Sequence, residues 1–269
     1  MRKKDTSQAL SVLMFGIAIL LFLLLTIQFY PQADWYNETE NTDSSEHDVV
    51  EYAPINEESH LGVFTDPDSE RTMDYHIYFP DNATEHMPLI VYLHGTGAIG
   101  NSVYNEMNPA ISKAIEVYGE VFPFILLAPS SMFRNSWRQD HMPYLVKALI
   151  DDIAERYNVD RTKIIIIGHS MGAGGVMRQI ELFGDYYSAA VPVSLTNTDN
   201  VDITACLDVP IWGFAGTEEA PYDYNMKKLF VKINDSGGKA LFSALEGAEH
   251  GNSADFAFTL EVFEWAIRQ

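Results

Sequence analysis

Beyond about residue 60 the chain contains two kinds of apolar pattern. Short apolar runs are separated by longer stretches with the character of helices. The short runs predict strands at Leu61–Phe64, Met73–Phe79, Leu89–Leu93, Phe124–Ala128, Lys163–Gly168, Ala189–Ser194, Pro210–Ala215 and Lys239–Leu245. The longer stretches predict helices at Asn108–Val117, Tyr144–Tyr157, Gly172–Phe183, Tyr224–Ile233 and Asp255–Arg268.

Strands that are apolar on both faces and are separated by helices indicate a parallel sheet covered by helices on both sides. We therefore predict an α/β protein with a doubly wound, mostly parallel sheet. The first two strands have no helix between them, so the sheet is predicted to begin with an antiparallel meander. Because no internal repeat is evident, residues 59–269 are predicted to form one domain.

A different apolar run lies near the N-terminus. Residues 9–30 carry no charge, and about twenty apolar residues are enough to cross a bilayer as a helix. Arg2, Lys3 and Lys4 precede this run, so the positive-inside rule predicts that residues 1–8 are cytoplasmic. No small-x-small cleavage site follows the run, so we predict an uncleaved transmembrane signal-anchor at 9–30. A cleaved signal peptide, which would leave the protein secreted, is the alternative.

Charge and cysteine content add to this picture. Residues 31–58 are acidic and polar, and we predict a solvated tether that holds an extracytoplasmic domain away from the membrane. The formal net charge of the whole chain is -21, which disfavours binding to nucleic acid. Cys206 is the only cysteine, so it can form no intramolecular disulfide, and we interpret it as a small buried apolar residue.

The segment Gly168-His169-Ser170-Met171-Gly172 matches the pattern G-x-S-x-G where a predicted strand meets a predicted helix. A serine hydroxyl is a weak nucleophile, so it must be exposed on a sharp turn where a base can reach it. The following helix directs its N-terminal N–H groups at the place where negative charge would develop. Ser170 is therefore the candidate nucleophile, with a tight glycine-rich turn around an idle serine as the alternative.

A candidate base and a candidate acid follow the nucleophile. Of the eight histidines, His250 lies on a loop between the last predicted strand and the last predicted helix, which would end above the carboxyl edge of the sheet. Glu218, Glu219 and Asp223 lie on the loop after the seventh predicted strand, and each keeps the order serine, acid, histidine. We favour Glu219 as the acid, then Asp223, then Glu218.

Other residues at the same edge could complete a site. An oxyanion hole needs two backbone N–H donors, for which we predict Met171, directly after the nucleophile, and Thr96, with Gly97 as the alternative. Neighbouring His94 is interpreted as structural. Trp137, which follows the fourth predicted strand, is a candidate substrate-binding residue, with ordinary loop packing as the alternative.

Nucleotide and metal chemistry are disfavoured. Gly95–Gly100 matches the dinucleotide pattern G-x-G-x-x-G, but that function needs an acidic residue at the end of the next strand. Here the next strand ends in Ala128-Pro129-Ser130-Ser131. The chain also lacks an H-E-x-x-H motif and a pair of cysteines, so we predict no cofactor and no metal.

Taken together, these motifs resemble the α/β-hydrolase superfamily, and within it exported bacterial esterases of the feruloyl/acetylxylan esterase and phospholipase/carboxylesterase type. The similarity extends from about Met73 to the C-terminus and is carried by Pro88–Gly97, Ala128-Pro129, Val159-Asp160-Arg161 and Gly168–Gly175. Such relatives usually have Gly-x-x-Asp in the acid loop, where this chain has Glu219. The resemblance implies hydrolysis of a small-molecule or glycan-linked ester through an acyl-enzyme, without a cofactor.

Two other functions stay open at this point. A peptidase or amidase would use the same three side chains, because the G-x-S-x-G turn does not select the bond that is cleaved. A catalytically inactive, surface-anchored binding module would keep the fold without the reaction. Inactive relatives usually lose a residue of the triad, so the presence of Ser170 and His250 favours an enzyme.

Overall fold

The computed structural model describes residues 58–98, 109–118, 124–131 and 136–269. Contacts along the chain separate the unit Met1–Val50 from the unit Glu51–Gln269, and all described residues belong to the second unit. The predicted anchor at 9–30 and the predicted tether, except for its last residue, lie outside these ranges. Within them no helix is both long enough and apolar enough to cross a membrane.

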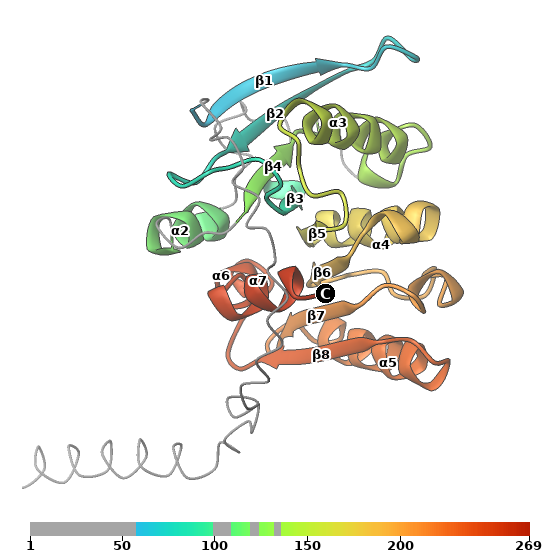
Figure 1. The fold of residues 1–269 in the computed structure, drawn as a ribbon. Helices are drawn as coiled ribbons and strands as arrows, with labels where there is room; N and C mark the ends of the chain where they lie inside the picture. Colours follow the sequence, from blue (N-terminus) through green and yellow to red (C-terminus); the bar gives the residue numbers. More distant parts are fainter. Residues whose placement is uncertain (1–57, 99–108, 119–123, 132–135) are drawn as a thin grey trace, which may run out of the picture. The chain divides into compact units, whose positions relative to one another are not determined.

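The described residues form one sheet of eight strands in the order β1-β2-β4-β3-β5-β6-β7-β8 (Figure 1). The strands are β1 (His60–Thr65), β2 (Thr72–Tyr78), β3 (Leu89–Leu93), β4 (Ile125–Pro129), β5 (Ile164–His169), β6 (Ala189–Val193), β7 (Ile211–Gly216) and β8 (Ala240–Leu245). β2 runs antiparallel to both of its neighbours, β1 and β4. Every other pair in the sheet is parallel. This confirms the predicted strands and the antiparallel start of a mostly parallel sheet.

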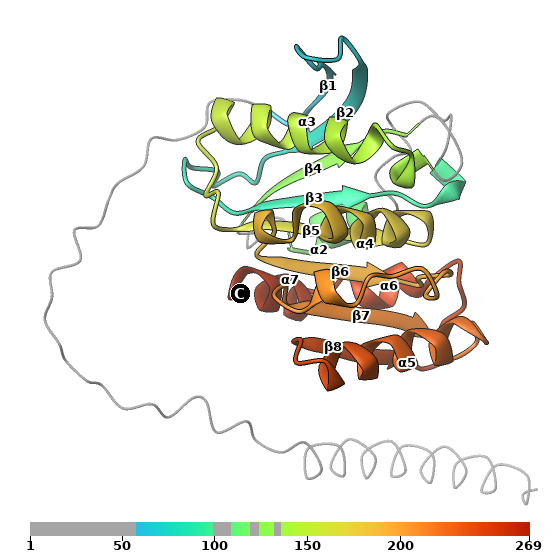
Figure 2. The ribbon, with the colours of Figure 1, turned by 90° about the vertical axis from the view of Figure 1, so that its right-hand side faces the viewer.

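Helices cover both faces of this sheet. They are α2 (Pro109–Tyr118), α3 (Met142–Arg156), α4 (Met171–Phe183), α5 (Tyr222–Asp235), α6 (Ser253–Ala257) and α7 (Leu260–Ile267). α3, α4 and α5 lie on the face that is turned toward the viewer in Figure 2, and α2, α6 and α7 lie on the opposite face. The predicted doubly wound arrangement is therefore confirmed.

The last predicted helix, Asp255–Arg268, is wrong as a single element. The chain forms α6 and α7 instead, and Thr259 between them has an extended backbone (φ -106°, ψ 163°). Phe258 at the break is buried, with its ring against Tyr92 of β3 and Phe263 of α7. The apolar pattern of the segment does not reveal the break.

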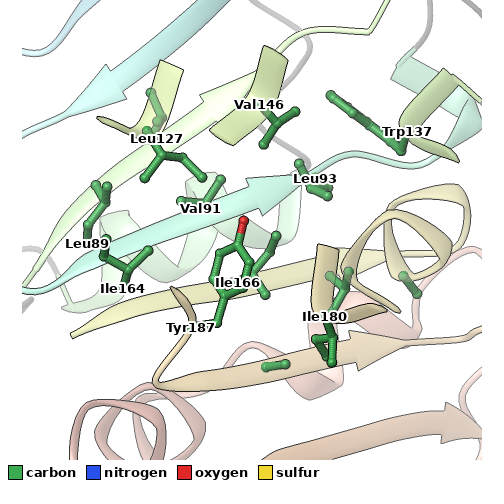
Figure 3. Packing of buried hydrophobic residues seen from close by; sticks show 14 of the residues in the cluster. Leu89, Val91, Leu93, Leu127, Trp137, Val146, Ile164, Ile166, Ile180 and Tyr187 are labelled. Carbon is green, nitrogen blue, oxygen red and sulfur yellow. The ribbon is translucent and has the colours of Figure 1, made fainter. Parts of the chain in front are cut away.

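The central strands β3 and β5 are buried on both faces. Alternate residues contribute to two apolar clusters, so that Val91 and Ile166 pack on one side of the sheet while Ile90 and Ile165 pack on the other. Figure 3 shows the first side, where labelled residues of the strands meet Val146 of α3. Each fully buried aliphatic side chain contributes about 1.5–3 kcal/mol. The sheet is thus held from both faces, and its carboxyl edge is a firm support for loops.

Candidate active site

Ser170 lies in the turn between β5 and α4, with a backbone conformation (φ 56°, ψ -113°) that residues other than glycine rarely adopt. The turn is held because the Ser170 N–H donates to the Val193 carbonyl of β6 at 2.9 Å. A Cβ at Gly172 would lie 1.8 Å from the Leu93 carbonyl oxygen, and one at Gly168 would lie 2.6 Å from the Gly172 carbonyl carbon. Only glycine fits these positions, so the G-x-S-x-G pattern reflects close packing of α4 against the ends of β3 and β5.

Three side chains from separate parts of the chain meet at this turn. The Ser170 Oγ lies 2.8 Å from the His250 Nε2, and the Nδ1 of the same imidazole lies 2.7 Å from the Glu219 Oε2. In this geometry the serine hydroxyl donates to the imidazole, and the opposite ring N–H donates to the carboxylate. The His250 side chain is 39% exposed and that of Glu219 is 0% exposed. A solute can therefore reach the imidazole while the carboxylate is shielded from water.

Glu219 is the carboxylate, among the three candidates, that the fold brings to His250. Glu218 precedes it and is exposed. Asp223 lies in the first turn of α5, where its Oδ1 is buried without a hydrogen-bond partner in the described residues. Of the three candidates from the sequence, Glu219 is thus the one whose carboxylate contacts the His250 ring.

The second oxygen of Glu219 is also held. Its Oε1 accepts hydrogen bonds from the Gly216 N–H at 2.7 Å and from the Ser194 hydroxyl at 2.6 Å. Burial raises the pKa of Glu219, but the hydrogen bonds from His250, Ser194 and Gly216 outweigh this effect and lower its pKa below the ordinary value. Glu219 is therefore ionised at neutral pH, as a group that stabilises an imidazolium must be.

The side chain of His169, next to Ser170, contacts the backbone of His250. The His169 Nε2–H donates to the His250 carbonyl oxygen at 2.9 Å, and the centroids of the two rings are 5.3 Å apart. Burial and the neighbouring His250 lower the pKa of His169 to about 4. His169 is thus neutral at physiological pH and holds the loop that carries His250.

This buried neutral histidine predicts sensitivity to acid. The unfolded chain binds a proton at His169 near pH 6.5, and the folded chain binds it near pH 4. The contribution of neutral His169 to the free energy of unfolding is therefore fully present above pH 6.5 and is lost as the pH falls toward 4. The expected loss between pH 7 and pH 4 is about 3 kcal/mol. His169→Gln keeps an N–H donor but cannot titrate, so its free energy of unfolding should depend less on pH. Denaturant unfolding of both proteins at pH 7 and pH 4 measures this. Equal pH dependence in the two would contradict the assignment.

The residues predicted for an oxyanion hole flank Ser170. Met171 is the first residue of α4, and Thr96 begins the short 3-10 helix η2 (Thr96–Ala98) after β3. A Cβ at Gly95 would lie 3.5 Å from the Ser170 Cβ, so this loop packs directly against the turn. Two chain segments with backbone N–H groups therefore adjoin the serine.

His94 has the structural position that the sequence predicts. It is fully buried, with its Nδ1 2.8 Å from the Gly95 carbonyl oxygen, and its Nε2 accepts a hydrogen bond from the Ser131 N–H at 3.0 Å. The imidazole therefore ties the loop after β3 to the segment after β4. It supports the loop that contains Thr96 and does not contact the Ser170 hydroxyl.

The predicted substrate-binding role of Trp137 does not fit the structure. Its side chain is 1% exposed, and its indole N–H donates to the His94 carbonyl oxygen at 2.9 Å. A Cβ at Gly175 of α4 would lie 2.7 Å from the Trp137 Cβ. The indole therefore fills space between helix α4 and the loop after β3, which is the packing alternative. Met132 and Phe133, which the sequence places near Trp137, lie outside the described residues.

Three residues near the site were not predicted from the sequence. Ser194 and Ser253 are fully buried and their hydroxyl oxygens lie 2.6 Å apart, next to Glu219. The Tyr222 ring lies 5.9 Å from the His250 ring, centroid to centroid. Ser194 could have been noticed, because it is a polar residue at the carboxyl end of a predicted apolar strand. Ser253 and Tyr222 have no such signal, since only loop folding brings them to the site.

The site shows no sign of metal ligation within the ranges that the structure describes. No group of three or more His, Cys, Asp or Glu side chains in the described part of the chain could hold a metal ion. The imidazole and carboxylate of the site instead hydrogen-bond to each other and to Ser170. What this arrangement can do chemically is to remove a proton from a serine hydroxyl and to stabilise the charge that results.

The sheet order, the helices on both faces and a serine on the turn from β5 to α4 define an α/β-hydrolase fold. No protein-family model matches the chain. In sequence it is similar to a bifunctional acetylxylan esterase/xylanase, XynS20E, of Neocallimastix patriciarum, with 25% identity over 162 residues. That alignment covers 59% of this chain and 23% of the relative, so the chain spans about a quarter of the curated relative it matches.

Solved structures give the same class. A thermostable esterase matches with a TM-score of 0.69 and 25% identity over 79% of this chain and 63% of its own. A fluorophosphonate-binding serine hydrolase of Staphylococcus aureus, FphF, matches with a TM-score of 0.60 and 15% identity over 79% and 100% of the two chains. A ferulic acid esterase has a TM-score of 0.58 and 14% identity over 78% and 99%. At these identities, the last two structures show only that they have the same fold as this chain. The chain thus resembles esterases of the α/β-hydrolase type, which confirms the predicted resemblance and supports a hydrolase.

Proposed function

We propose that this protein hydrolyses carboxylic esters through an acyl-enzyme formed on Ser170. The observation that carries the proposal is the hydrogen-bonded series from the Ser170 hydroxyl through His250 to the buried carboxylate of Glu219. The similarity to an acetylxylan esterase/xylanase and to a thermostable esterase supports an ester as the bond that is cleaved.

The first half of the proposed reaction forms the acyl-enzyme. His250 Nε2 takes the proton from the Ser170 Oγ while that oxygen attacks the ester carbonyl carbon. The carbonyl oxygen becomes negatively charged, and the backbone N–H groups of Met171 and Thr96 donate hydrogen bonds to it. The bond from carbon to the leaving oxygen then breaks, and His250 gives its proton to the alcohol that departs.

The second half regenerates the serine. A water molecule takes the place of the alcohol, His250 removes one of its protons, and the hydroxide attacks the acyl carbon. Collapse of this second tetrahedral species breaks the bond to the Ser170 Oγ, which recovers a proton from His250 and releases the carboxylic acid. Glu219 stays ionised throughout and stabilises the imidazolium in both halves.

The exposure of His250 supports a substrate whose leaving group extends away from the site. Because the His250 side chain is 39% exposed, the leaving group can extend into solvent rather than fit inside a closed cavity. This accommodates esters carried on a glycan as well as small-molecule esters. The acetylxylan esterase named among the relatives favours the glycan-linked kind.

We also propose that residues 9–30 anchor the protein in the cell membrane and that the domain from residue 59 onward acts outside the cytoplasm. The uncharged run and the basic residues before it support this. Cell fractionation followed by protease treatment of intact cells tests it. Recovery of the full-length chain in the soluble cytoplasm would contradict it.

The reaction is tested by labelling the purified full-length chain with a fluorophosphonate probe and locating the adduct by peptide mass spectrometry. We expect one adduct on Ser170 in the folded protein and none after heat denaturation. Matched aryl ester and aryl amide substrates then separate an esterase from an amidase. A folded protein that takes up no probe would refute an activated serine, and faster cleavage of the amide would favour the peptidase or amidase.

A further inference from the structure

Glu219 must hold one of its oxygens toward His250, and its side chain is not suited to do this alone. A glutamate has one more rotatable bond than an aspartate, and its terminal torsion is soft. The Gly216 N–H that contacts Oε1 belongs to the same short turn as Glu219, because the Glu219 N–H donates to the Gly216 carbonyl oxygen at 3.1 Å. Gly216 is the last residue of β7, so this contact holds Oε1 against the end of that one strand.

Ser194 supplies a donor from a different element. It directly follows β6, and its hydroxyl lies 2.6 Å from the Glu219 Oε1. Its own N–H donates to the Phe214 carbonyl oxygen of β7 at 2.7 Å, which fixes its backbone between two strands. Ser194 is fully buried and has a φ of 55°, a strained value for a residue with a Cβ. A strained, buried, polar residue at the edge of a sheet needs a reason, and its contact with Glu219 is one.

Ser253 extends this contact toward the loop of the base. It is fully buried at the start of α6, and its Oγ lies 2.6 Å from the Ser194 Oγ and 3.4 Å from the His250 carbonyl oxygen. An ionised carboxylate can only accept, so the Ser194 proton is directed at Glu219. The short contact between the serines then requires Ser253 to donate to Ser194. The protons of the two hydroxyls thus point in series at Glu219, an arrangement that strengthens each bond.

We propose that Ser194 is the positioning residue for the triad acid and that Ser253 acts only through Ser194. This rests on the proposed function and goes beyond it, because it assigns to a second and a third serine the task of holding the Glu219 carboxylate in line with His250. The two serines connect three elements that the reaction needs in register, which are strand β6, the loop of Glu219 and helix α6, whose first residue Ser253 follows His250 by three positions.

The test compares Ser194→Ala, Ser253→Ala and the double variant in the full-length protein, with Ser188→Ala as the matched control. Ser188 directly precedes β6, at the opposite end of the strand, and its hydroxyl contacts the Ile164 carbonyl oxygen at 3.4 Å. For Ser194→Ala we expect a fall in kcat for an aryl ester of about 10- to 100-fold, the range for loss of a hydrogen bond to a charged group, with little change in KM. For Ser253→Ala we expect about 2- to 10-fold.

The double variant separates positioning from ordinary packing. If Ser253 acts only through Ser194, the double variant loses no more than Ser194→Ala, whereas independent packing effects would multiply. The low-field proton resonance of the His250 Nδ1–H should also shift in Ser194→Ala and stay unchanged in Ser188→Ala. Should Ser194→Ala fold poorly, Ser194→Gly removes the same hydroxyl and relieves the backbone strain, and the same fall in kcat is expected.

The outcomes distinguish this inference from the proposed function. If the probe labels the wild type but kcat is unchanged in Ser194→Ala and Ser194→Gly, only the positioning role of Ser194 is overturned, and the proposed function stands. Multiplicative losses in the double variant would overturn the serial arrangement. A folded wild-type chain that takes up no probe would overturn the proposed function, and the positioning role with it.

Discussion

Replacement of Ser170 by alanine is expected to lower kcat for ester hydrolysis by about six orders of magnitude, the loss typical of removing the nucleophile of a serine hydrolase. The effect is large because the covalent route is lost completely. Alanine keeps the Cβ and therefore the strained backbone of the turn, so the thermal stability of the variant should match that of the wild type. Steady-state kinetics with an aryl ester, together with thermal unfolding, measure both quantities.

A double variant tests whether Ser170 and His250 act together. Removal of His250 from a protein that already lacks Ser170 should cost nothing further, since the two side chains act as one unit at a 2.8 Å contact. The control is His250→Ala alone, which should lose about as much activity as Ser170→Ala. Activity of Ser170→Ala within tenfold of the wild type would place the nucleophile elsewhere and refute the acyl-enzyme on Ser170.

Glu219→Gln is expected to lower kcat by about four orders of magnitude, the loss seen when a triad acid is replaced by its amide. Glu219 receives hydrogen bonds from His250, Ser194 and Gly216, and all three are donors. A glutamine offers one oxygen and one NH₂ group, so the NH₂ either faces the donors Ser194 and Gly216 or forces His250 into the wrong tautomer. The charge that stabilises the His250 imidazolium is lost as well. kcat measured for the variant near neutral pH gives the size of the effect.

The two neighbouring acids provide matched controls for Glu219. Glu218→Gln and Asp223→Asn remove the same charge from the same part of the chain without touching His250, so each should keep kcat within about threefold. Loss of activity in Asp223→Asn together with an active Glu219→Gln would show that the acid loop rearranges and that Asp223 is the acid.

Much of the fold was accessible from local patterns. The apolar runs predicted all eight strands of the described sheet. The signal is strongest for β3 to β7, because strands buried on both faces must be continuously apolar. The helices followed in the same way, except that the segment Asp255–Arg268 divides into α6 and α7. Phe258 at the break packs against Tyr92 of β3, and a contact between residues so far apart in sequence cannot be read from apolar spacing.

The candidate site was predictable to a lesser degree. Gly168 and Gly172 mark the turn of Ser170 because a backbone approach that excludes any Cβ leaves a trace in the sequence. The choice of Glu219 over Glu218 and Asp223 stayed a preference until the geometry of the loop showed which carboxylate meets His250. Trp137 was misjudged because its position after a strand indicates the correct edge of the sheet but not whether the side chain is exposed.

The sequence by itself determined the element types and the doubly wound class, and it predicted Ser170 and His250 as candidate site residues. Each of these leaves a local pattern of apolar spacing, glycines or a histidine in a late loop. Only the tertiary structure decided which groups touch. The contacts from Ser170 to His250, from His250 to Glu219 and from Ser194 to Ser253 join positions 80, 31 and 59 residues apart. Such contacts depend on how loops from different strands pack above one sheet edge, and no local pattern records that packing.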